Sequence, residues 1–321
     1  MNTLRLIALW SAVLTCAIAL WWPEQAIETA SGSGAVLMFD ITQSMNVEDV
    51  GISKTPLSRL QMAKQAALLA VDELPCGTAL GSGIFAAHRA LLLTAPIEVC
   101  ANRLEIRKSI NFIGPAMAWH GNSEIAKAWY ASLKIGAGLT GKPAIVFLTD
   151  GHEAPPLSPL HRPVYDEPEG RGAGLMVGIG GNRPVPIPKR DPSGRALGFW
   201  NADEVMQIDR YQQGRGGSAS GEKMVELDDG TKPDLRVGAT PGSEHLSALR
   251  EPYLRLLATE TAASYVRLDK PEALLSGLQE VLVMPGLSDL NTRRLLAALA
   301  LLLVGLFYRL SALRYIPGVR L

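Results

Sequence analysis

The polar run Asp40-Ile41-Thr42-Gln43-Ser44 places one carboxylate and two hydroxyls close together in the chain. Oxygen donors at this spacing suit a hard cation, and Mg²⁺ favours octahedral oxygen sites in which it keeps some of its waters. The alternative is a hydrogen-bonded Asx or ST turn that caps the next element, and the run by itself favours that plainer interpretation. A cation site here therefore needs support from other parts of the sequence.

Two later segments give that support. Asp150 follows the apolar run Ala144 to Thr149, and Ser123 opens the helical segment that precedes this run. In open α/β sheets the carboxyl ends of the strands meet at one edge, where ligands bind. The residues that carry the predicted metal site are Asp40, Thr42, Ser44, Ser123 and Asp150.

The elements that must position these residues alternate between strands and helices. Continuous apolar runs predict buried parallel strands at Gly34 to Asp40, Ala144 to Thr149 and Leu175 to Ile179. Helical periodicity predicts helices between and after them, with one more strand at Tyr265 to Leu268. The predicted helices are Leu57 to Leu74, Asn102 to Phe112, Glu124 to Ile135, Leu246 to Ala263 and Pro271 to Val283. This alternation predicts an α/β fold with a doubly wound, mainly parallel sheet.

One antiparallel hairpin interrupts the alternation. Two β-rich runs, Thr78 to Ala86 and Ala90 to Pro96, flank His88, and Cys76 and Cys100 are equally far from it. A hairpin that turns near His88 brings both cysteines to its open end, within the Cα separation that a disulfide needs. The sequence therefore predicts a Cys76–Cys100 disulfide in an oxidising compartment, with two unpaired buried thiols as the alternative.

The predicted domain spans residues 34–283 and contains two long irregular stretches, 154–172 and 182–244. Inside the second, a hairpin is predicted to turn at Asp191-Pro-Ser-Gly194. A further segment, Gly136 to Lys142, contains G-x-G-x-x-G and most of a phosphate-binding loop. It follows a helix and precedes a strand, the reverse of the order that those motifs require, so a helix end and a turn are predicted instead.

Apolar segments lie at both ends of the chain. Residues 4–22 and 294–313 approach the ~20 residues needed to cross a bilayer, so each is predicted to be a transmembrane helix. A cleaved signal peptide is the alternative for the first. Arg5, Arg314 and Arg320 lie at or beyond the outer ends of these segments and predict cytoplasmic termini. The region between is then expected in the periplasm of a bacterium, anchored in the inner membrane.

Composition narrows the classes of function. The 321 residues carry 31 basic and 31 acidic side chains, and 19% of residues are charged, below the ~25% usual in soluble domains. All acids lie between Glu24 and Asp289, and six arginines lie in or beside the end segments, which leaves 25 basic residues against 31 acids in the central region. A mildly acidic domain suits cation binding and argues against nucleic acid as a partner.

The order of the five site residues resembles the von Willebrand factor A (vWA) family over roughly Gly34 to Val283. That family's metal-ion-dependent adhesion site combines Asp-x-Ser/Thr-x-Ser, a Thr from a middle loop and an Asp after a central strand. The resemblance implies Mg²⁺ held directly by Thr42, Ser44 and the middle-loop residue, with the two aspartates acting largely through water. One coordination position stays open for an acidic group of a protein partner. Here the middle-loop residue is Ser123 in place of Thr, and Asn122 is the alternative ligand.

The run Val185 to Trp200, with its Pro-x-Pro and Asp-x-x-Gly-Arg, is similar to bacterial Bat-type vWA proteins, which are associated with MoxR-type AAA+ ATPases. Finer motifs look closer to the membrane-bound vWA accessory proteins of methanol-oxidation gene clusters (MxaL type). The motifs are Phe39 to Met45, Leu74-Pro-Cys76, Cys100, Met117-Ala-Trp119, Asn122-Ser123-Glu124 and Thr149 to Pro156. The narrower resemblance implies maturation of periplasmic methanol dehydrogenase, including insertion of its Ca²⁺, with that enzyme or other vWA accessory subunits as partners. The broader one implies an adaptor for a MoxR-type ATPase in complex assembly or stress tolerance.

An enzymatic role, as a metal-dependent hydrolase that uses Asp40, is an alternative from another class. The sequence has no G-x-S-x-G nucleophile motif, and no two histidines have helical zinc-ligand spacing. His120 and His152 lie in loops near the predicted metal, where they could hydrogen-bond its ligands or contact a partner. The sequence therefore predicts a non-enzymatic binding protein, in which Trp119 and Trp129 are packing residues.

Overall fold

The computed structural model of the chain describes residues 10, 34–51, 56–157, 161–166, 174–191, 194–205, 222–226, 244–282, 299–302 and 304. The chain divides into two compact units, one formed by Thr29–Met284 and one by Met1–Glu28 with Pro285–Leu321. The predicted membrane segments 4–22 and 294–313 belong to the second unit and lie almost wholly outside the described residues. Within the residues that are described, no helix combines the length and the apolar character that a membrane crossing needs.

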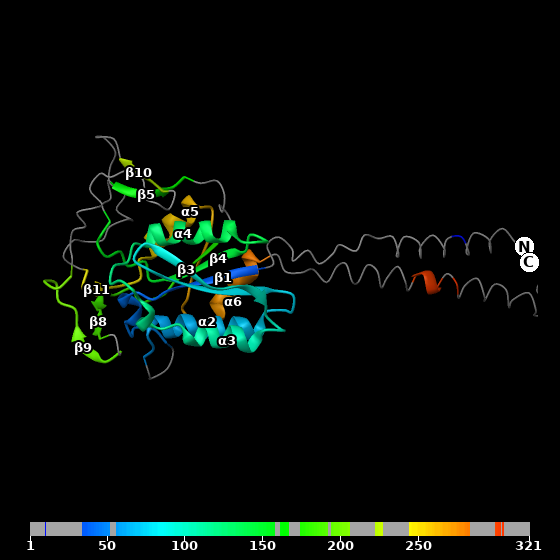
Figure 1. The fold of residues 1–321 in the computed structure, drawn as a ribbon, viewed down its shortest axis with the longest axis horizontal. Helices are drawn as coiled ribbons and strands as arrows, with labels where there is room; N and C mark the ends of the chain where they lie inside the picture. Colours follow the sequence, from blue (N-terminus) through cyan, green and yellow to red (C-terminus); the bar gives the residue numbers. More distant parts are fainter. Residues whose placement is uncertain are drawn as a thin grey trace, which may run out of the picture. The chain divides into compact units, whose positions relative to one another are not determined.

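The first unit is built around a six-stranded sheet with the strand order β12-β6-β4-β1-β2-β3 (Figure 1). Neighbouring strands run parallel except for β2 and β3, which form an antiparallel hairpin. The strands are β1 (Gly34–Asp40), β2 (Ala79–Ala86), β3 (Arg89–Glu98), β4 (Ala144–Thr149), β6 (Gly174–Gly178) and β12 (Ser264–Arg267). The predicted α/β class with a mainly parallel sheet is confirmed.

Helices cover both faces of this sheet (Figure 1). One face carries α2 (Arg59–Glu73), α3 (Arg103–Phe112) and α6 (Glu272–Val281). The other face carries α4 (Ile125–Gly138) and α5 (Glu251–Glu260). Helices on both faces bury the central strands, which explains why β1, β4 and β6 are apolar up to their carboxyl ends.

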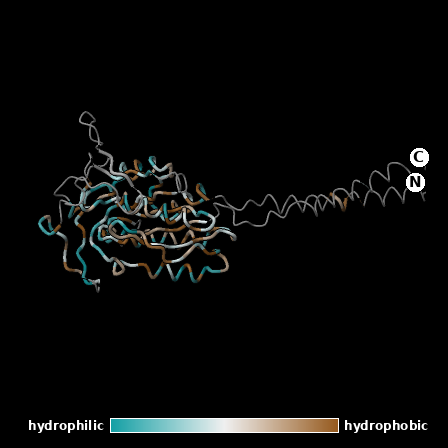
Figure 2. Tube along the Cα trace, turned by 45° about the horizontal axis from the view of Figure 1, so that its top comes forward, coloured by the Kyte–Doolittle hydropathy of each residue, from teal (hydrophilic) through white to brown (hydrophobic). Residues whose placement is uncertain are grey.

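Two hydrophobic cores hold these layers together, one on each face of the sheet. From β1, Leu37 and Phe39 belong to the core under α2, α3 and α6. Val36 and Met38 belong to the core under α4 and α5, together with Trp129, which is fully buried as predicted. Figure 2 shows hydrophobic and hydrophilic residues alternating along the trace of this domain. The alternation of side chains along a strand therefore decides which core each residue serves.

The β2–β3 hairpin turns at Ala87 and His88, and Ala87 adopts a left-handed φ of 53°. At its open end Cys76 and Cys100 form a disulfide with a Cα–Cα distance of 5.2 Å. The predicted hairpin and disulfide are both confirmed, and the alternative of two unpaired thiols is wrong. The bond ties the segment before β2 to the segment before α3.

The predicted helix from Leu246 to Ala263 starts later than expected, because α5 begins at Glu251. Leu246–Ser247 instead forms strand β11, which pairs with β7 (Val185–Pro186). Pro252 explains the boundary, since proline lacks an N–H and fits an α-helix only in its first turn.

The irregular stretches contain more strand than the sequence predicts. β5 (His161–Tyr165) pairs with β10 (Glu222–Glu226), so the two stretches form a small antiparallel sheet. Tyr165 helps to hold β5 in place, because its ring is buried against the ring of Tyr130, with 5.3 Å between the centroids. The predicted hairpin at Asp191-Pro-Ser-Gly194 is present as β8 (Pro188–Arg190) and β9 (Ala196–Phe199).

Candidate metal centre

The candidate site lies at the carboxyl ends of β1 and β4, which are neighbours in the sheet. Asp40 is the last residue of β1, and Asp150 follows the last residue of β4. From β1 the chain continues to β2 on one side, whereas β4 and β6 extend the sheet on the other side. The site therefore sits at a topological switch point, where open α/β sheets form their binding crevices.

The run after β1 forms both a hydrogen-bonded turn and a cluster of oxygen atoms. Asp40 Oδ1 accepts hydrogen bonds from the backbone N–H of Thr42 at 2.9 Å and from its hydroxyl at 2.6 Å. Thr42 Oγ1 lies 3.4 Å from Ser44 Oγ, at the start of a 3-10 helix (Gln43–Asn46). The other carboxylate oxygen, Asp40 Oδ2, accepts a hydrogen bond from the Thr149 hydroxyl at 2.7 Å. The turn that the plainer interpretation requires is present, and it orients the two hydroxyls next to each other.

Ser123 reaches the same place from the middle loop. Its backbone N–H donates to the Ala154 carbonyl at 2.8 Å and its carbonyl accepts from the Ala154 N–H at 2.9 Å. The neighbouring Asn122 carbonyl accepts from the Ala87 N–H at 2.9 Å, so the loop is fixed to the ends of both β2 and β4. The Ser123 side chain is 1% exposed, and its hydroxyl has no hydrogen-bond partner. A buried hydroxyl in this condition costs free energy unless a ligand satisfies it.

Asp150 is held by a buried arginine that the sequence analysis did not identify. The Arg59 guanidinium, which is fully buried, forms an ion pair with Asp150 and a second one with Asp49, whose Oδ2 lies 2.7 Å from Arg59 Nη2. Ser247 donates a hydrogen bond from Oγ to Asp150 Oδ2 at 3.0 Å. The backbone N–H of His152 donates to Asp150 Oδ1 at 2.9 Å. Arg59, Ser247 and His152, which lie far apart or on separate loops in the sequence, thus hold the Asp150 carboxylate in place.

The two aspartates differ in their tendency to hold a proton. Burial raises the pKa of Asp40 to about 7, and the negative charge of Asp150 adds to this, while hydrogen bonds from Thr42 and Thr149 oppose it. Burial also acts to raise the pKa of Asp150, but the Arg59 charge outweighs it and the net direction is downward, with a hydrogen bond from Ser44 contributing. The Arg59 charge therefore stabilises only one of the two carboxylates, and a bound cation would compensate the other.

The hydroxyls open into a cavity of about 230 Å³. Thr42, Ser44, Ser123 and His152 line it from the sheet side. A second part of the lining belongs to the segment between β6 and α5, whose two ends are joined by the hydrogen bond from Leu249 N–H to the Gly181 carbonyl at 2.9 Å. This part contains Ile187, Trp200, Glu204, Val205 and Glu244. One side of the cavity is therefore formed by hydroxyl oxygens fixed at the sheet edge, and another side by the segment between β6 and α5.

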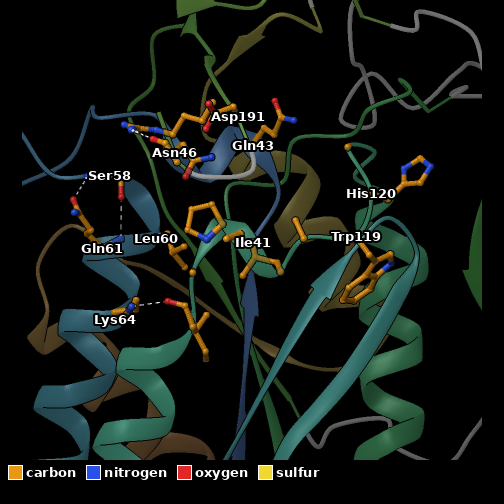
Figure 3. Close-up of a pocket in the computed structure, with 18 of the residues that line it drawn as sticks. Ile41, Gln43, Asn46, Ser58, Leu60, Gln61, Lys64, Trp119, His120 and Asp191 are labelled. Carbon is orange, nitrogen blue, oxygen red and sulfur yellow. Dashed lines mark hydrogen bonds between the residues drawn. The ribbon is translucent and has the colours of Figure 1, made fainter. Parts of the chain in front are cut away.

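A larger cavity of about 660 Å³ adjoins the first, and Gln43 and Gly121 line both (Figure 3). Figure 3 shows Trp119 and His120 on one side of it and Lys64 on the other. The Trp200 indole N–H donates to the Gln43 side chain, on the boundary between the two cavities. Trp119 is 45% exposed, so of the core or loop packing expected for it, a place in the core is excluded.

The residues present fit a hard divalent cation. Three hydroxyls, from Thr42, Ser44 and Ser123, face one cavity, with two buried carboxylates behind them. Oxygen donors of this kind suit Mg²⁺ or Mn²⁺. All five predicted residues thus meet at one edge of the sheet, and whether they bind a metal stays a prediction.

Four further residues support the site, namely Asp49, Arg59, Thr149 and Ser247. Arg59 had a signal in the sequence, as a charge beside the apolar stripe of a helix. Thr149 had one as the residue directly before Asp150. Ser247 had none, because it lies 97 residues from its partner along the chain.

Comparisons with known proteins give distant structural likenesses. No protein-family model matches the chain, and no curated protein matches it. Similar solved structures include an aerotolerance-related membrane protein of Bacteroides fragilis, 17% identical over 77% of this chain and 97% of that one, with a TM-score of 0.46. An uncharacterized membrane-spanning protein of Vibrio fischeri is 18% identical over 77% of this chain and 95% of that one, with a TM-score of 0.26. The PilB minor pilin of Streptococcus sanguinis is 15% identical over 84% of this chain and 62% of that one, with a TM-score of 0.40.

Proposed function

We propose that this chain is a membrane-anchored, metal-dependent protein-binding module of the vWA type, with its central domain in the bacterial periplasm. Thr42, Ser44 and Ser123 would hold a divalent cation, and Asp40 and Asp150 would act behind them through water. A cation held in this way offers a coordination position to a carboxylate of a partner protein. The observation that carries the proposal is the buried Ser123 hydroxyl, which has no partner and faces the same cavity as the Thr42 and Ser44 hydroxyls.

Binding is favoured over hydrolysis by the surroundings of the cavity. Nucleophilic catalysis requires a nucleophile within hydrogen-bond reach of a base. Neither ring nitrogen of His152 hydrogen-bonds a hydroxyl or a carboxylate. The Thr42 hydroxyl does donate to Asp40 Oδ1 at 2.6 Å, but Asp40 is not among the residues that line the cavity, and the role that we propose is non-enzymatic.

The partner that we propose is periplasmic methanol dehydrogenase or an accessory subunit that acts on it. This finer proposal is supported by the sequence motifs, such as Phe39 to Met45 and Thr149 to Pro156, that resemble vWA accessory proteins of methanol-oxidation clusters. The module would then assist maturation of the enzyme, including delivery of its Ca²⁺.

The decisive experiment is co-purification of the full chain from detergent-solubilised membranes, with and without EDTA. We expect wild-type protein to retain its partner when Mg²⁺ is present and to lose it in EDTA. Asp40→Ala should lose the partner in both conditions. Asp72→Ala, which removes a surface carboxylate paired with Arg107, is the matched control and should behave like wild type.

Three outcomes separate the proposals. Methanol dehydrogenase among the retained proteins supports the finer proposal, whereas a MoxR-type ATPase in its place would support the Bat-type adaptor instead. Retention that is insensitive both to EDTA and to Asp40→Ala would contradict a metal-bridged contact.

A further inference from the structure

A second buried polar group in the cavity has no partner, and it is a nitrogen ligand. The His152 ring is 4% exposed, and neither Nδ1 nor Nε2 has a hydrogen-bond partner of normal geometry. The ring approaches the backbone of Glu244 without reaching such geometry. An imidazole buried without a partner is costly, as a buried hydroxyl is, so a ligand that satisfies it would stabilise the protein.

The position of His152 is fixed by the same network that fixes Asp150. Its backbone N–H donates to Asp150 Oδ1, and the preceding Gly151 has a φ of +76°, which a side chain rarely allows. The methyl group of an alanine at Gly151 would also lie 3.0 Å from Leu254 Cγ. The backbone turn therefore fixes the position of His152, which lines the same cavity as Thr42 and Ser123.

Imidazole changes the metal preference of an oxygen site. Hydroxyl and carboxylate oxygens suit Mg²⁺, Ca²⁺ and Mn²⁺, whereas imidazole nitrogen suits first-row transition metals, which follow the Irving–Williams order of affinity. We propose that the His152 imidazole is a direct ligand of the cation held by Thr42, Ser44 and Ser123. The site then takes a first-row transition-metal dication, with Mn²⁺ as the test ion, in preference to Mg²⁺. The proposal rests on the metal site of the proposed function but is independent of the partner.

The chain offers a matched control in His120. That residue lines the adjoining larger cavity (Figure 3), and its Nδ1 already accepts a hydrogen bond from the Asn122 N–H at 3.1 Å. It is exposed, so it needs no metal to satisfy it. Glu204, another residue of the smaller cavity, is held by Lys189 at 2.5 Å and needs no cation either.

The test uses the full chain in detergent, stripped with EDTA and loaded with Mn²⁺. Pulsed electron paramagnetic resonance detects the ¹⁴N hyperfine coupling of an imidazole bound directly to Mn²⁺. We expect this coupling in wild type and in His120→Gln, and not in His152→Gln. We also expect wild type to bind Mn²⁺ more tightly than Mg²⁺, and His152→Gln to lose about tenfold or more in Mn²⁺ affinity while its Mg²⁺ affinity changes little.

The outcomes distinguish this proposal from the metal site itself. Bound Mn²⁺ without ¹⁴N coupling in wild type would overturn the role of His152 and leave the oxygen site standing. Coupling that persists in His152→Gln would overturn it as well. If folded wild type binds neither Mn²⁺ nor Mg²⁺, the metal site fails and this proposal fails with it. If His152→Gln does not fold, the spectra of wild type and His120→Gln test the proposal. The absence of ¹⁴N coupling in wild type would contradict it.

Discussion

At the scale of single residues, Arg59 is the side chain on which the candidate site depends most. It lies at the start of α2, where Ser58 closes a capping box with Gln61, so the helix begins with its charge directed at the site. Its guanidinium is paired with Asp150 and Asp49 and is fully buried. A buried charge is tolerated only when it is paired, so removal of either partner leaves a charge that neither water nor protein compensates.

Arg59→Met should therefore destabilise the fold strongly. We expect the free energy of unfolding to fall by about 3–5 kcal/mol, because Asp150 loses its buried counter-charge. Urea denaturation of the EDTA-treated protein measures this loss. Arg107→Met removes a pair with Asp72 on the surface and is the control, with an expected cost below about 1 kcal/mol. Equal effects of the two substitutions would refute the structural role of Arg59.

Glu153 gives the fold a dependence on pH. Its Oε1 accepts hydrogen bonds from Tyr253 Oη at 2.6 Å and from the Ala126 N–H at 3.2 Å, while Oε2 has no hydrogen-bond partner. Burial raises the pKa of Glu153 from 4.5 to about 7, and the charge of Glu124 adds to this, against the hydrogen bonds. The folded state thus holds a proton that the unfolded state releases between pH 4.5 and 7.

The stability contributed by this proton is complete below pH 4.5 and is lost as the pH rises through 7. Its size is on the order of 3 kcal/mol. Glu153→Gln should therefore match wild type at pH 4.5 and exceed its stability at pH 8, as measured by urea denaturation in EDTA. Glu251→Gln is the control. Burial acts to raise the pKa of Glu251, but Arg255 and Arg267 lower it overall, so its contribution runs in the opposite direction with pH. A wild-type-like pH profile in Glu153→Gln would contradict the assignment.

The sequence sufficed to identify the residues that the ends of strands bring together. Asp40 and Asp150 follow apolar runs, and the geometry of parallel strands places such residues at one edge. The residues that support Asp150 could not be predicted from the sequence, because Arg59 and Ser247 lie 91 and 97 residues from it along the chain. No local pattern encodes which buried charge meets which carboxylate.

At the scale of elements, the backbones of β2 and β3 approach each other closely at Gly81. The ladder is irregular between Leu80 and Ser82, at Gly81. A methyl group at Gly81 would lie 2.6 Å from the Thr94 carbonyl oxygen and 2.9 Å from Pro96 N. Both are backbone atoms, which cannot rotate away as a side chain can.

Gly81→Ala should therefore destabilise the protein by about 2–3 kcal/mol through overpacking. Gly138→Ala is the matched control, since a methyl group at the end of α4 would have no atom within 4 Å. It should leave stability unchanged or raise it by up to about 1 kcal/mol, because alanine restricts the unfolded chain. Thermal unfolding of both variants tests the contrast. A Gly81→Ala protein as stable as Gly138→Ala would show that the hairpin can shift.

The elements themselves were predictable to different degrees. β1 and β4 have the predicted bounds, because continuous apolar runs with an acid at the end have few other interpretations. The early start predicted for α5 was wrong because tertiary pairing of β11 with β7 competes with helix formation before Pro252. The pairing of β5 with β10 joins segments about 60 residues apart, and periodicity within one segment carries no signal of such a partner.

At the scale of the whole molecule, a bound cation should act as a stabiliser. Ligands that bind only the folded state add RT ln(1 + [L]/Kd), about 2.7 kcal/mol at one hundred times the dissociation constant. For a domain of this size, that corresponds to a rise in Tm of about 5 °C or more. Wild type should show this rise when saturating Mn²⁺ is added to the EDTA-treated protein.

Ser123→Ala distinguishes an effect on cation binding from an effect on the stability of the fold. It removes a buried hydroxyl without a partner, so its Tm in EDTA should equal or exceed that of wild type, whereas the rise with Mn²⁺ should shrink or vanish. Thr78→Val also removes a buried hydroxyl without a partner, but away from the cavity, and should keep the full rise. Scanning calorimetry gives both values. An undiminished rise in Ser123→Ala would exclude Ser123 as a ligand.

The hydrogen bond from Leu249 to Gly181 closes a long excursion of the chain at its base, and this has a consequence for how such a protein can diversify. The candidate ligands Thr42, Ser44 and Ser123 lie at the edge of the sheet, and the segment between Gly181 and Leu249 lines another side of the cavity. An exchange of the segment between these two residues that retains Ser247, whose hydroxyl donates to Asp150, would replace the surface that the proposed partner would meet and leave the hydrogen-bonded edge of the sheet intact, because loop length adds little to the cost of closure. We therefore expect recombination at this base to change the partner specificity in one step. No evolutionary intermediate would have to lose the candidate cation ligands.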